Sequence, residues 1–212
     1  MTREDQNGVA DRIETILPRL MDLPTGRRNL VALAGPPASG KSTLAASLVT
    51  ALNRAGRLAA LVPMDGFHLD NKILTERGLL DRKGAPETFD LGGFTRLVAA
   101  LSTRSEVVCP IFDRTRDIAI AGAAVVPSSC EIVVIEGNYL LLDTPGWRDL
   151  SAYWNLSVFL KTKADVLRER LVERWIAEGL TVADAAARAD QNDMPNAVLI
   201  LEESISADIV VP

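Results

Sequence analysis

Short apolar runs alternate with amphipathic stretches along most of this chain of 212 residues. The apolar runs are rich in β-branched residues and each is close to the length of a buried strand; they cover 29–34, 58–64, 131–136, 156–161 and 207–211. Helical spacing of apolar residues marks the stretches between them, at 42–55, 92–103 and 163–178. This alternation predicts an α/β fold in which helices cover both faces of a central parallel sheet of about five strands.

A glycine-rich loop, GPPASGKS at 35–42, joins the first expected strand to the first long expected helix. It matches G-x-x-x-x-G-K-[ST], in which backbone N–H groups and the start of the helix surround phosphate oxygens. Lys41 would reach the β- and γ-phosphates of a nucleotide, and the hydroxyl of Ser42 would ligate Mg²⁺. We therefore expect the nucleotide contacts to come from Gly35, Pro36, Pro37, Ala38, Ser39, Gly40, Lys41, Ser42 and Thr43.

Two acidic residues stand at the ends of other expected strands. Glu136 ends a buried run, and at a sheet edge it can bind the metal beside Ser42, although such a side chain can also be merely solvated. Asp65 ends the run at 58–64 and could accept a proton from a hydroxyl that attacks the γ-phosphate. The glycine- and charge-rich segment 65–90 shows weak periodicity, so we expect it to be a functional loop that surrounds an organic acceptor.

Composition narrows the class of protein. A formal charge of −5 disfavours a nucleic-acid partner, and the apolar runs are far too short to cross a membrane. The N-terminus resembles no signal peptide, and Cys109 and Cys130 are expected to be buried free thiols, so we predict a cytoplasmic protein. Residues 8–23 predict an amphipathic helix that Pro18 kinks or ends, and a homodimer is one expected form.

Several motifs together resemble the P-loop small-molecule kinases, which include uridine kinase, bacterial pantothenate kinase and phosphoribulokinase. The matching pieces occur in the family's order: GPPASGKS (35–42), MDGFHLDN (64–71), RKGAPETFD (82–90), PIFDR (110–114), EGNYLLL (136–142) and LRERLVER (167–174). The sequence is more similar to the pantothenate-kinase branch and to fructose-transport-system kinases than to uridine kinase.

The resemblance implies a three-layer P-loop NTPase sandwich, formed by one kinase domain over 1–212, that uses ATP and Mg²⁺. Asp65 falls at the position of the catalytic base and Glu136 at that of the metal-associated acid. Arg170 and Arg174 fall in the lid helix region 163–178, where guanidinium groups close over the phosphates. Arg168 is equally compatible with a solvated helix face.

The acceptor pocket is predicted from scattered polar residues. They are His68, Arg82, Lys83, Asp90, Asp113, Arg114, Asn138 and Tyr139. Each charged member has an alternative as a surface ion pair, and His68 has one as a packed residue. Asp193 or Asn196 is expected to cap the last helix, with an adenine contact as the alternative, and Trp147, Trp154 and Trp175 are expected to pack.

These observations predict ATP-dependent phosphorylation of a small hydroxylated metabolite, with a sugar or sugar-like alcohol preferred. A nucleotide-dependent regulator of a transporter or metabolic enzyme is the alternative from another class. A nucleoside or pantothenate kinase is the third interpretation.

Overall fold

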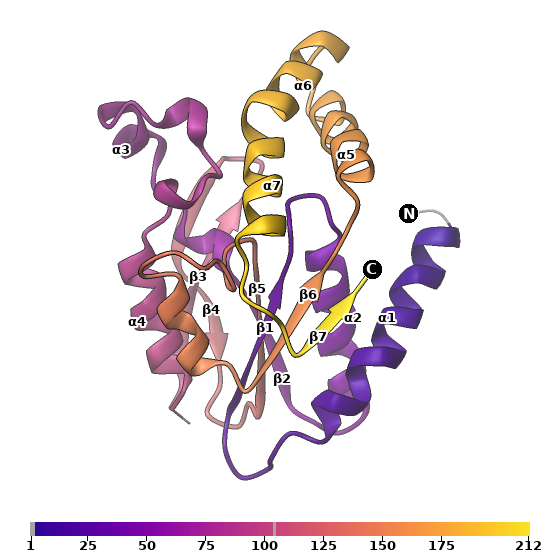
Figure 1. Ribbon diagram of the computed structural model, residues 1–212. Helices are drawn as coiled ribbons and strands as arrows, with labels where there is room; N and C mark the ends of the chain where they lie inside the picture. The colour runs from indigo at the N-terminus through magenta and orange to yellow at the C-terminus, as the bar shows by residue number, and fades with distance from the viewer. Residues whose placement is uncertain (1–2, 104) are drawn as a thin grey trace.

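The computed structural model describes residues 3–103 and 105–212 and contains a central sheet of five parallel strands (Figure 1). The strand order is β2-β5-β1-β6-β7. The bounds are β1 Asn29–Ala34, β2 Ala59–Pro63, β5 Ile132–Gly137, β6 Leu156–Leu160 and β7 Ile209–Val211. Each of the five lies within about two residues of an expected run. The central strands β1, β5 and β6 are buried on both faces of the sheet, whereas the edge strands β2 and β7 are partly exposed.

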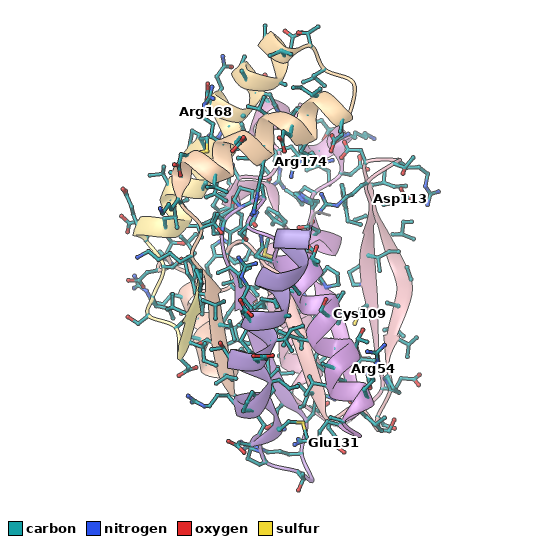
Figure 2. The ribbon with its side chains drawn as sticks, turned by 90° about the vertical axis from the view of Figure 1, so that its right-hand side faces the viewer. Arg54, Cys109, Asp113, Glu131, Arg168 and Arg174 are labelled. Atoms are coloured by element: carbon teal, nitrogen blue, oxygen red, sulfur yellow. The ribbon has the colours of Figure 1, made fainter. Side chains whose placement is uncertain are left out.

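Helices cover both faces, which gives the expected three layers. On one face, α1 (Arg3–Met21) and α2 (Lys41–Arg54) pack against the strands through residues such as Ile16, Leu44 and Leu48. On the other face, α4 (Leu91–Leu101) and the 3₁₀ helix η4 (Arg148–Tyr153) enclose a core with Phe94 and Trp147. Figures 1 and 2 show the two helical layers from directions at right angles.

Above the sheet, a helical lid follows β6. It consists of α5 (Ala164–Ala177), α6 (Val182–Arg188), a π-helical segment η5 (Ala189–Asp193) and α7 (Met194–Glu202). The last three run without a break, so η5 and α7 share one helical path. Figure 1 shows α5 and α6 projecting beyond the carboxyl ends of the strands.

Three local features differ from the sequence expectations. Helix α1 continues through Pro18 to Met21, so Pro18 does not end it. The segment 65–90 has structure of its own: η1 (Met64–Phe67), α3 (Asn71–Glu76), η2 (Leu80–Arg82) and η3 (Pro86–Thr88). These helices are too short for apolar periodicity to reveal them.

The third difference is an antiparallel hairpin beside the main sheet. Its strands are β3 (Val107–Asp113) and β4 (Ile118–Val126), neither of which is among the five expected runs. Strand β4 has apolar or small residues at its exposed as well as its partly buried positions, so its sequence lacks the apolar–polar alternation that marks a half-buried strand. Cys109 and Cys130 are free and buried, as expected. No helix in the described part of the chain is long and apolar enough to cross a membrane.

Candidate active site

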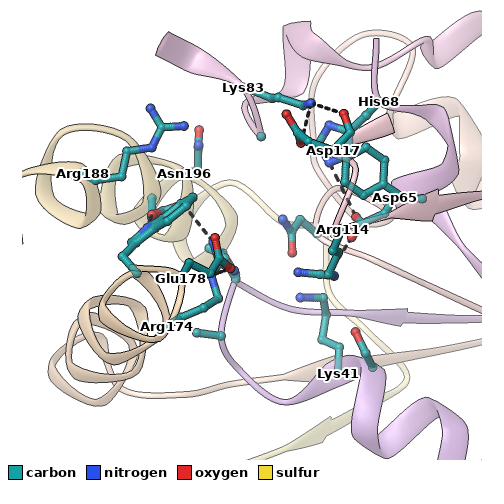
Figure 3. Close-up of a pocket in the computed structure, with 18 of the residues that line it drawn as sticks. Lys41, Asp65, His68, Lys83, Arg114, Asp117, Arg174, Glu178, Arg188 and Asn196 are labelled. Carbon is teal, nitrogen blue, oxygen red and sulfur yellow. Dashed lines mark hydrogen bonds and ion pairs between the residues drawn. The ribbon is translucent and has the colours of Figure 1, made fainter. Parts of the chain in front are cut away.

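A cavity of about 910 Å³ opens between the carboxyl ends of the strands, the hairpin and the lid. Its floor comes from the glycine-rich loop and from the ends of β2 and β5. Figure 3 shows lid residues on one side and the residues of segment 65–90 and the hairpin on the other, with Lys41 below. Polar, charged and aromatic side chains make up much of its lining. They include Lys41, Ser42, Asp65, His68, Asn71, Lys83, Arg114, Asp117, Glu136, Asn138, Arg174, Trp175, Arg188, Asp193 and Asn196.

The glycine-rich loop has the backbone that its sequence predicted. Gly40 has φ 94°, in the left-handed region that favours glycine, and α2 begins directly after it. A Cβ on Gly35 would lie 2.9 Å from the carbonyl oxygen of Leu160, so only glycine allows the loop to pass this close to β6. Lys41 is buried and donates a 3.0 Å hydrogen bond to the carbonyl of Pro36, and burial lowers the pKa of its ammonium group. A buried cation within a loop of this shape is suited to hold anionic phosphate oxygens.

Ser42 and Glu136 place two side-chain oxygen groups side by side. The Ser42 hydroxyl donates a 3.1 Å hydrogen bond to the Glu136 carboxylate, which is 6% exposed as a residue. Burial raises the pKa of Glu136, and the nearby Lys41 ammonium opposes that rise. The described residues contain no group of three or more His, Cys, Asp or Glu that could hold a metal ion. The hydroxyl and carboxylate oxygens of this pair are hard donors of the kind that Mg²⁺ takes, since the ion uses one or two protein oxygens and completes its shell with phosphate and water.

Asp65 lies on the neighbouring strand tip, since β2 pairs with β5 and Pro63 is in register with Glu136. Its carboxylate accepts a 2.9 Å hydrogen bond from Nη2 of Arg114 at the end of the hairpin. His68 Nε2 lies 4.0 Å from the other carboxylate oxygen. The strand end, the hairpin and η1 thus hold this carboxylate in the cavity near Lys41 (Figure 3).

His68 is packed between two aromatic rings. The ring centroids of Phe89 and Phe112 lie 4.1 and 4.8 Å from that of the imidazole. Burial lowers the pKa of His68 to about 4, with the Asp65 carboxylate opposing the shift, so the ring is neutral near pH 7. Both interpretations of His68 therefore hold: it is packed, and it lines the cavity.

The lid brings a further cluster to the cavity. The indole N–H of Trp175 donates a 2.6 Å hydrogen bond to Asp193, and the guanidinium groups of Arg174 and Arg188 lie 4.9 and 5.3 Å from the indole centroid. Arg174 also lies 3.9 Å from Asp193. The cluster orients two cations toward the cavity.

The family described as phosphoribulokinase / uridine kinase matches residues 30–212. This chain belongs to that family.

Two curated relatives cover most of the chain. YggC of Escherichia coli K12 is 36% identical over 198 residues, with 92% of this chain and 82% of that protein covered. The "putative uridine kinase C227.14" of Schizosaccharomyces pombe is 34% identical over 195 residues, with 87% and 83% covered. Among solved structures, the "putative fructose transport system kinase" of Silicibacter sp. TM1040 is 52% identical, with a TM-score of 0.90 and 96% and 98% of the two chains covered.

Family membership makes the chain a phosphotransferase that transfers a phosphoryl group from ATP to the hydroxyl of a small molecule. Mg²⁺, when bound, neutralises charge on the phosphate oxygens. The loop amides and the Lys41 ammonium are of the kind that suits phosphate oxygens, and Ser42 and Glu136 present oxygens of the kind that suits the ion.

Several residues expected in the acceptor pocket of this kinase lie outside it. Asp90 caps α4 by accepting a hydrogen bond from the Gly93 amide. Arg82 pairs with Glu87, at 3.1 Å, on the surface. Arg82 thus follows the alternative of a surface ion pair, whereas Asp90 serves as a helix cap.

Asp113 and Tyr139 also lie outside the cavity lining. Asp113 pairs at 2.7 Å with Arg116, its neighbour in the hairpin turn, and the backbone and side-chain hydrogen bonds from Arg116 lower its pKa. Tyr139 is fully buried and donates its hydroxyl hydrogen bond to the carbonyl of Gly84. Burial raises the pKa of the Tyr139 hydroxyl. Its bond to Gly84 supports the cavity wall from the side of the core.

In the lid, Arg174 lines the cavity, whereas Arg170 does not and donates a 3.4 Å hydrogen bond to the carbonyl of Ala38 in the phosphate loop. Arg168 pairs with Asp190 at 2.7 Å on the surface, as the solvated alternative predicted.

The capping prediction for α7 was wrong. Asp193 and Asn196 make no capping hydrogen bond, because η5 leads into α7 and leaves no free helix start. Both instead line the cavity.

Asn71 and Asp117 are cavity residues that the sequence analysis missed. Nζ of Lys83 donates 2.7 Å hydrogen bonds to Asn71 Oδ1 and Asp117 Oδ1, and Asn71 Nδ2 donates one of 2.7 Å to Asp117 Oδ2. Burial of Asp117 would raise its pKa, but the bonds from Lys83 and Asn71 outweigh it and lower the pKa. Lys83 therefore ties the hairpin turn to α3, and its charge is already balanced.

Trp175 and Arg188 also line the cavity, although Trp175 was expected to pack and Arg188 was not singled out. The sequence carries only a weak signal for Asp117, which is that an aspartate stands between two stretches of strand-forming residues, where a turn is expected. Trp175 and Arg188 lie on different helices, so sequence spacing could not bring them together.

Proposed function

We propose that this chain transfers the γ-phosphoryl group of ATP to a hydroxyl of a sugar or sugar-like alcohol. The observation that carries this proposal is that the Asp65 carboxylate and the Lys41 ammonium line one cavity. A kinase needs such a carboxylate, whereas a nucleotide-dependent regulator has no use for a second polar pocket. The printed name of the Silicibacter neighbour, a fructose transport system kinase, favours a sugar.

In the proposed mechanism, Asp65 accepts the proton of the attacking hydroxyl while that oxygen bonds to the γ-phosphorus. Lys41 and Arg174 stabilise the charge on the transferring group and on the ADP leaving group. Arg170, which does not line the cavity, is proposed to support the phosphate loop through its bond to the carbonyl of Ala38. Ser42 and Glu136 hold Mg²⁺. Residues 35–43 bind the phosphates.

The acceptor contacts are proposed to come from the residues beside Asp65. Arg114, Asn138 and His68 line that half of the cavity, and Phe89 and Phe112 form an apolar wall suited to the C–H face of a sugar. Lys83 is proposed to shape this wall through its bonds to Asn71 and Asp117. Arg82, Asp90, Asp113 and Tyr139 are not included, because their side chains are used elsewhere.

The test is ADP release from Mg·ATP with separate pools of sugars, vitamins and nucleosides. Stimulation by the sugar pool, with the phosphorylated product identified by mass spectrometry, is the expected result. Stimulation by nucleosides or vitamins instead would replace the acceptor class. Nucleotide binding without stimulation by any pool would favour the regulator. The cytoplasmic location, the homodimer and the extent of one kinase domain over 1–212 stay predictions.

A further inference from the structure

The lid touches the opposite side of the cavity at two backbone carbonyls, those of Asp81 in η2 and of Lys83 directly after it. The segment 79–85, which contains both carbonyls, is called the acceptor wall below. Nδ2 of Asn192 donates a 2.9 Å hydrogen bond to the carbonyl of Lys83, and Nη1 of Arg188 donates one of 3.1 Å to the carbonyl of Asp81. The partners are more than 100 positions apart in sequence. The opposite sides of the cavity are therefore connected across its mouth.

Asn192 contributes little to the lid itself. Its side chain is buried, at 3% residue exposure, and its Oδ1 has no hydrogen-bond partner among the described residues. A buried unpaired oxygen costs stability, and an apolar residue of similar size would avoid that cost. The benefit of asparagine here is the single bond that leaves the lid and reaches Lys83.

The π-helical segment places Asn192 where it can make that bond. Segments of this kind insert an extra residue into a helix and are found most often at functional sites. The next residue, Asp193, accepts the hydrogen bond from Trp175 and lies beside Arg174. Within this short segment, Asn192 thus contacts the acceptor wall, and the next residue, Asp193, contacts Trp175 and Arg174 of the lid.

On the wall, Lys83 passes the connection onward. Its backbone bonds the lid, and its side chain bonds Asn71 on α3 and Asp117 in the hairpin turn. The adjacent Gly84 is held by Tyr139 from the core. A movement of η5 would therefore be transmitted through Lys83 to α3 and to the hairpin turn.

We propose that Asn192 is a positioning residue that couples the nucleotide-bound lid to the acceptor wall. Closure of the lid arginines on the phosphates would strengthen the bond to Lys83 and hold the wall around the acceptor. By thermodynamic reciprocity, an acceptor that orders the wall then favours nucleotide binding. This inference rests on the proposed kinase function, but its test needs nucleotide only.

The experiment is hydrogen exchange of the full chain with and without the nonhydrolysable ATP analogue AMP-PNP and Mg²⁺. In the unmodified chain we expect the analogue to slow exchange of the wall amides at 79–85 by about tenfold, the equivalent of one well-made hydrogen bond. The isosteric Asn192→Asp removes the donor, so the same amides should change less than about twofold. The more exposed Arg188→Met, which removes the second bridge, should give an intermediate change.

Asp190→Asn is the matched control, because Asp190 lies on the same π-helical segment but pairs with Arg168 inside the lid. It should respond to the analogue as the unmodified chain does. A merely structural role for Asn192 would raise wall exchange equally with and without the analogue, leaving their ratio unchanged, and that result would overturn the inference. An unprotected wall in the unmodified chain, with nucleotide bound by calorimetry, would overturn it too while leaving the kinase function intact. Failure of the nucleotide itself to bind would instead count against the proposed function.

Discussion

Arg114 holds the carboxylate of Asp65 through a hydrogen bond of 2.9 Å that joins residues 49 positions apart. The pair links the hairpin to the tip of β2 and places one cation against the proposed base. The ion pair fixes the position of the carboxylate in the cavity. It also gives the site two residues whose roles can be separated by substitution.

Replacement of the proposed base should abolish turnover selectively. Asp65→Asn keeps the shape of the side chain but removes its ability to accept a proton, so we expect kcat to fall by about 10²–10⁴-fold with little change in AMP-PNP affinity. Steady-state kinetics and calorimetry measure the two. Asp143→Asn, at a surface carboxylate paired with Arg148, is the control. Unchanged kcat in Asp65→Asn would dismiss the assignment.

The hairpin offers a matched pair for testing the cation. Arg114→Gln should lower kcat/KM for the acceptor by about 10–100-fold, because it releases the carboxylate and removes a charge near the transferring group. Arg116→Gln removes an arginine two positions away whose partner, Asp113, lies outside the cavity lining. Its kinetics should stay within about twofold of the unmodified enzyme. Equal losses in both variants would indicate a general effect on the hairpin.

Metal dependence should respond to the acid on β5. Glu136→Gln keeps the hydrogen bond from Ser42 but loses a ligand charge, so the Mg²⁺ concentration for half-maximal activity should rise by about tenfold or more. Glu131→Gln, just before the opposite end of β5, is the control, since Glu131 pairs with Arg57 away from the cavity. Activity titrated with Mg²⁺ provides the readout. An unshifted titration for Glu136→Gln would argue against metal binding there.

The buried imidazole predicts a pH effect on stability. The pKa of His68 falls from 6.5 to about 4 on folding, so between these values the unfolded chain binds more protons than the folded one. Stability is therefore full above about pH 6.5 and is lost as the pH falls toward 4, by as much as about 3 kcal/mol from this residue. Urea unfolding of His68→Gln across this range should show a shallower decline. Parallel declines would refute the prediction.

A close approach of two backbones ties η1 to the hairpin. A Cβ on Gly66 would lie 2.7 Å from the carbonyl oxygen of Pro110, so Gly66→Ala must push the hairpin away from the neighbour of Asp65. We expect a loss of about 1–3 kcal/mol in the free energy of unfolding, together with reduced kcat. Gly8→Ala lies in α1 with nothing within 4 Å and should be neutral or stabilising by up to about 1 kcal/mol. Chemical denaturation checks both.

The sequence by itself determined the five sheet strands, the phosphate loop and the two strand-end acids. These features are local: burial on both faces marks a strand, and the spacing of Gly35, Gly40, Lys41 and Ser42 encodes one backbone shape. Parallel pairing then brings Asp65 and Glu136 to neighbouring strand tips, because carboxyl ends share one edge.

Only the tertiary structure decided which polar residues face the cavity. Asp90, Arg82 and Asp113 find partners within five positions along the chain and turn to local roles. Asp117, Trp175 and Asn192 reach the site or its walls through contacts between separate elements. Such contacts depend on how the hairpin and the lid pack above the sheet. Sequence periodicity predicts single elements and contains no information about how distant elements pack against one another.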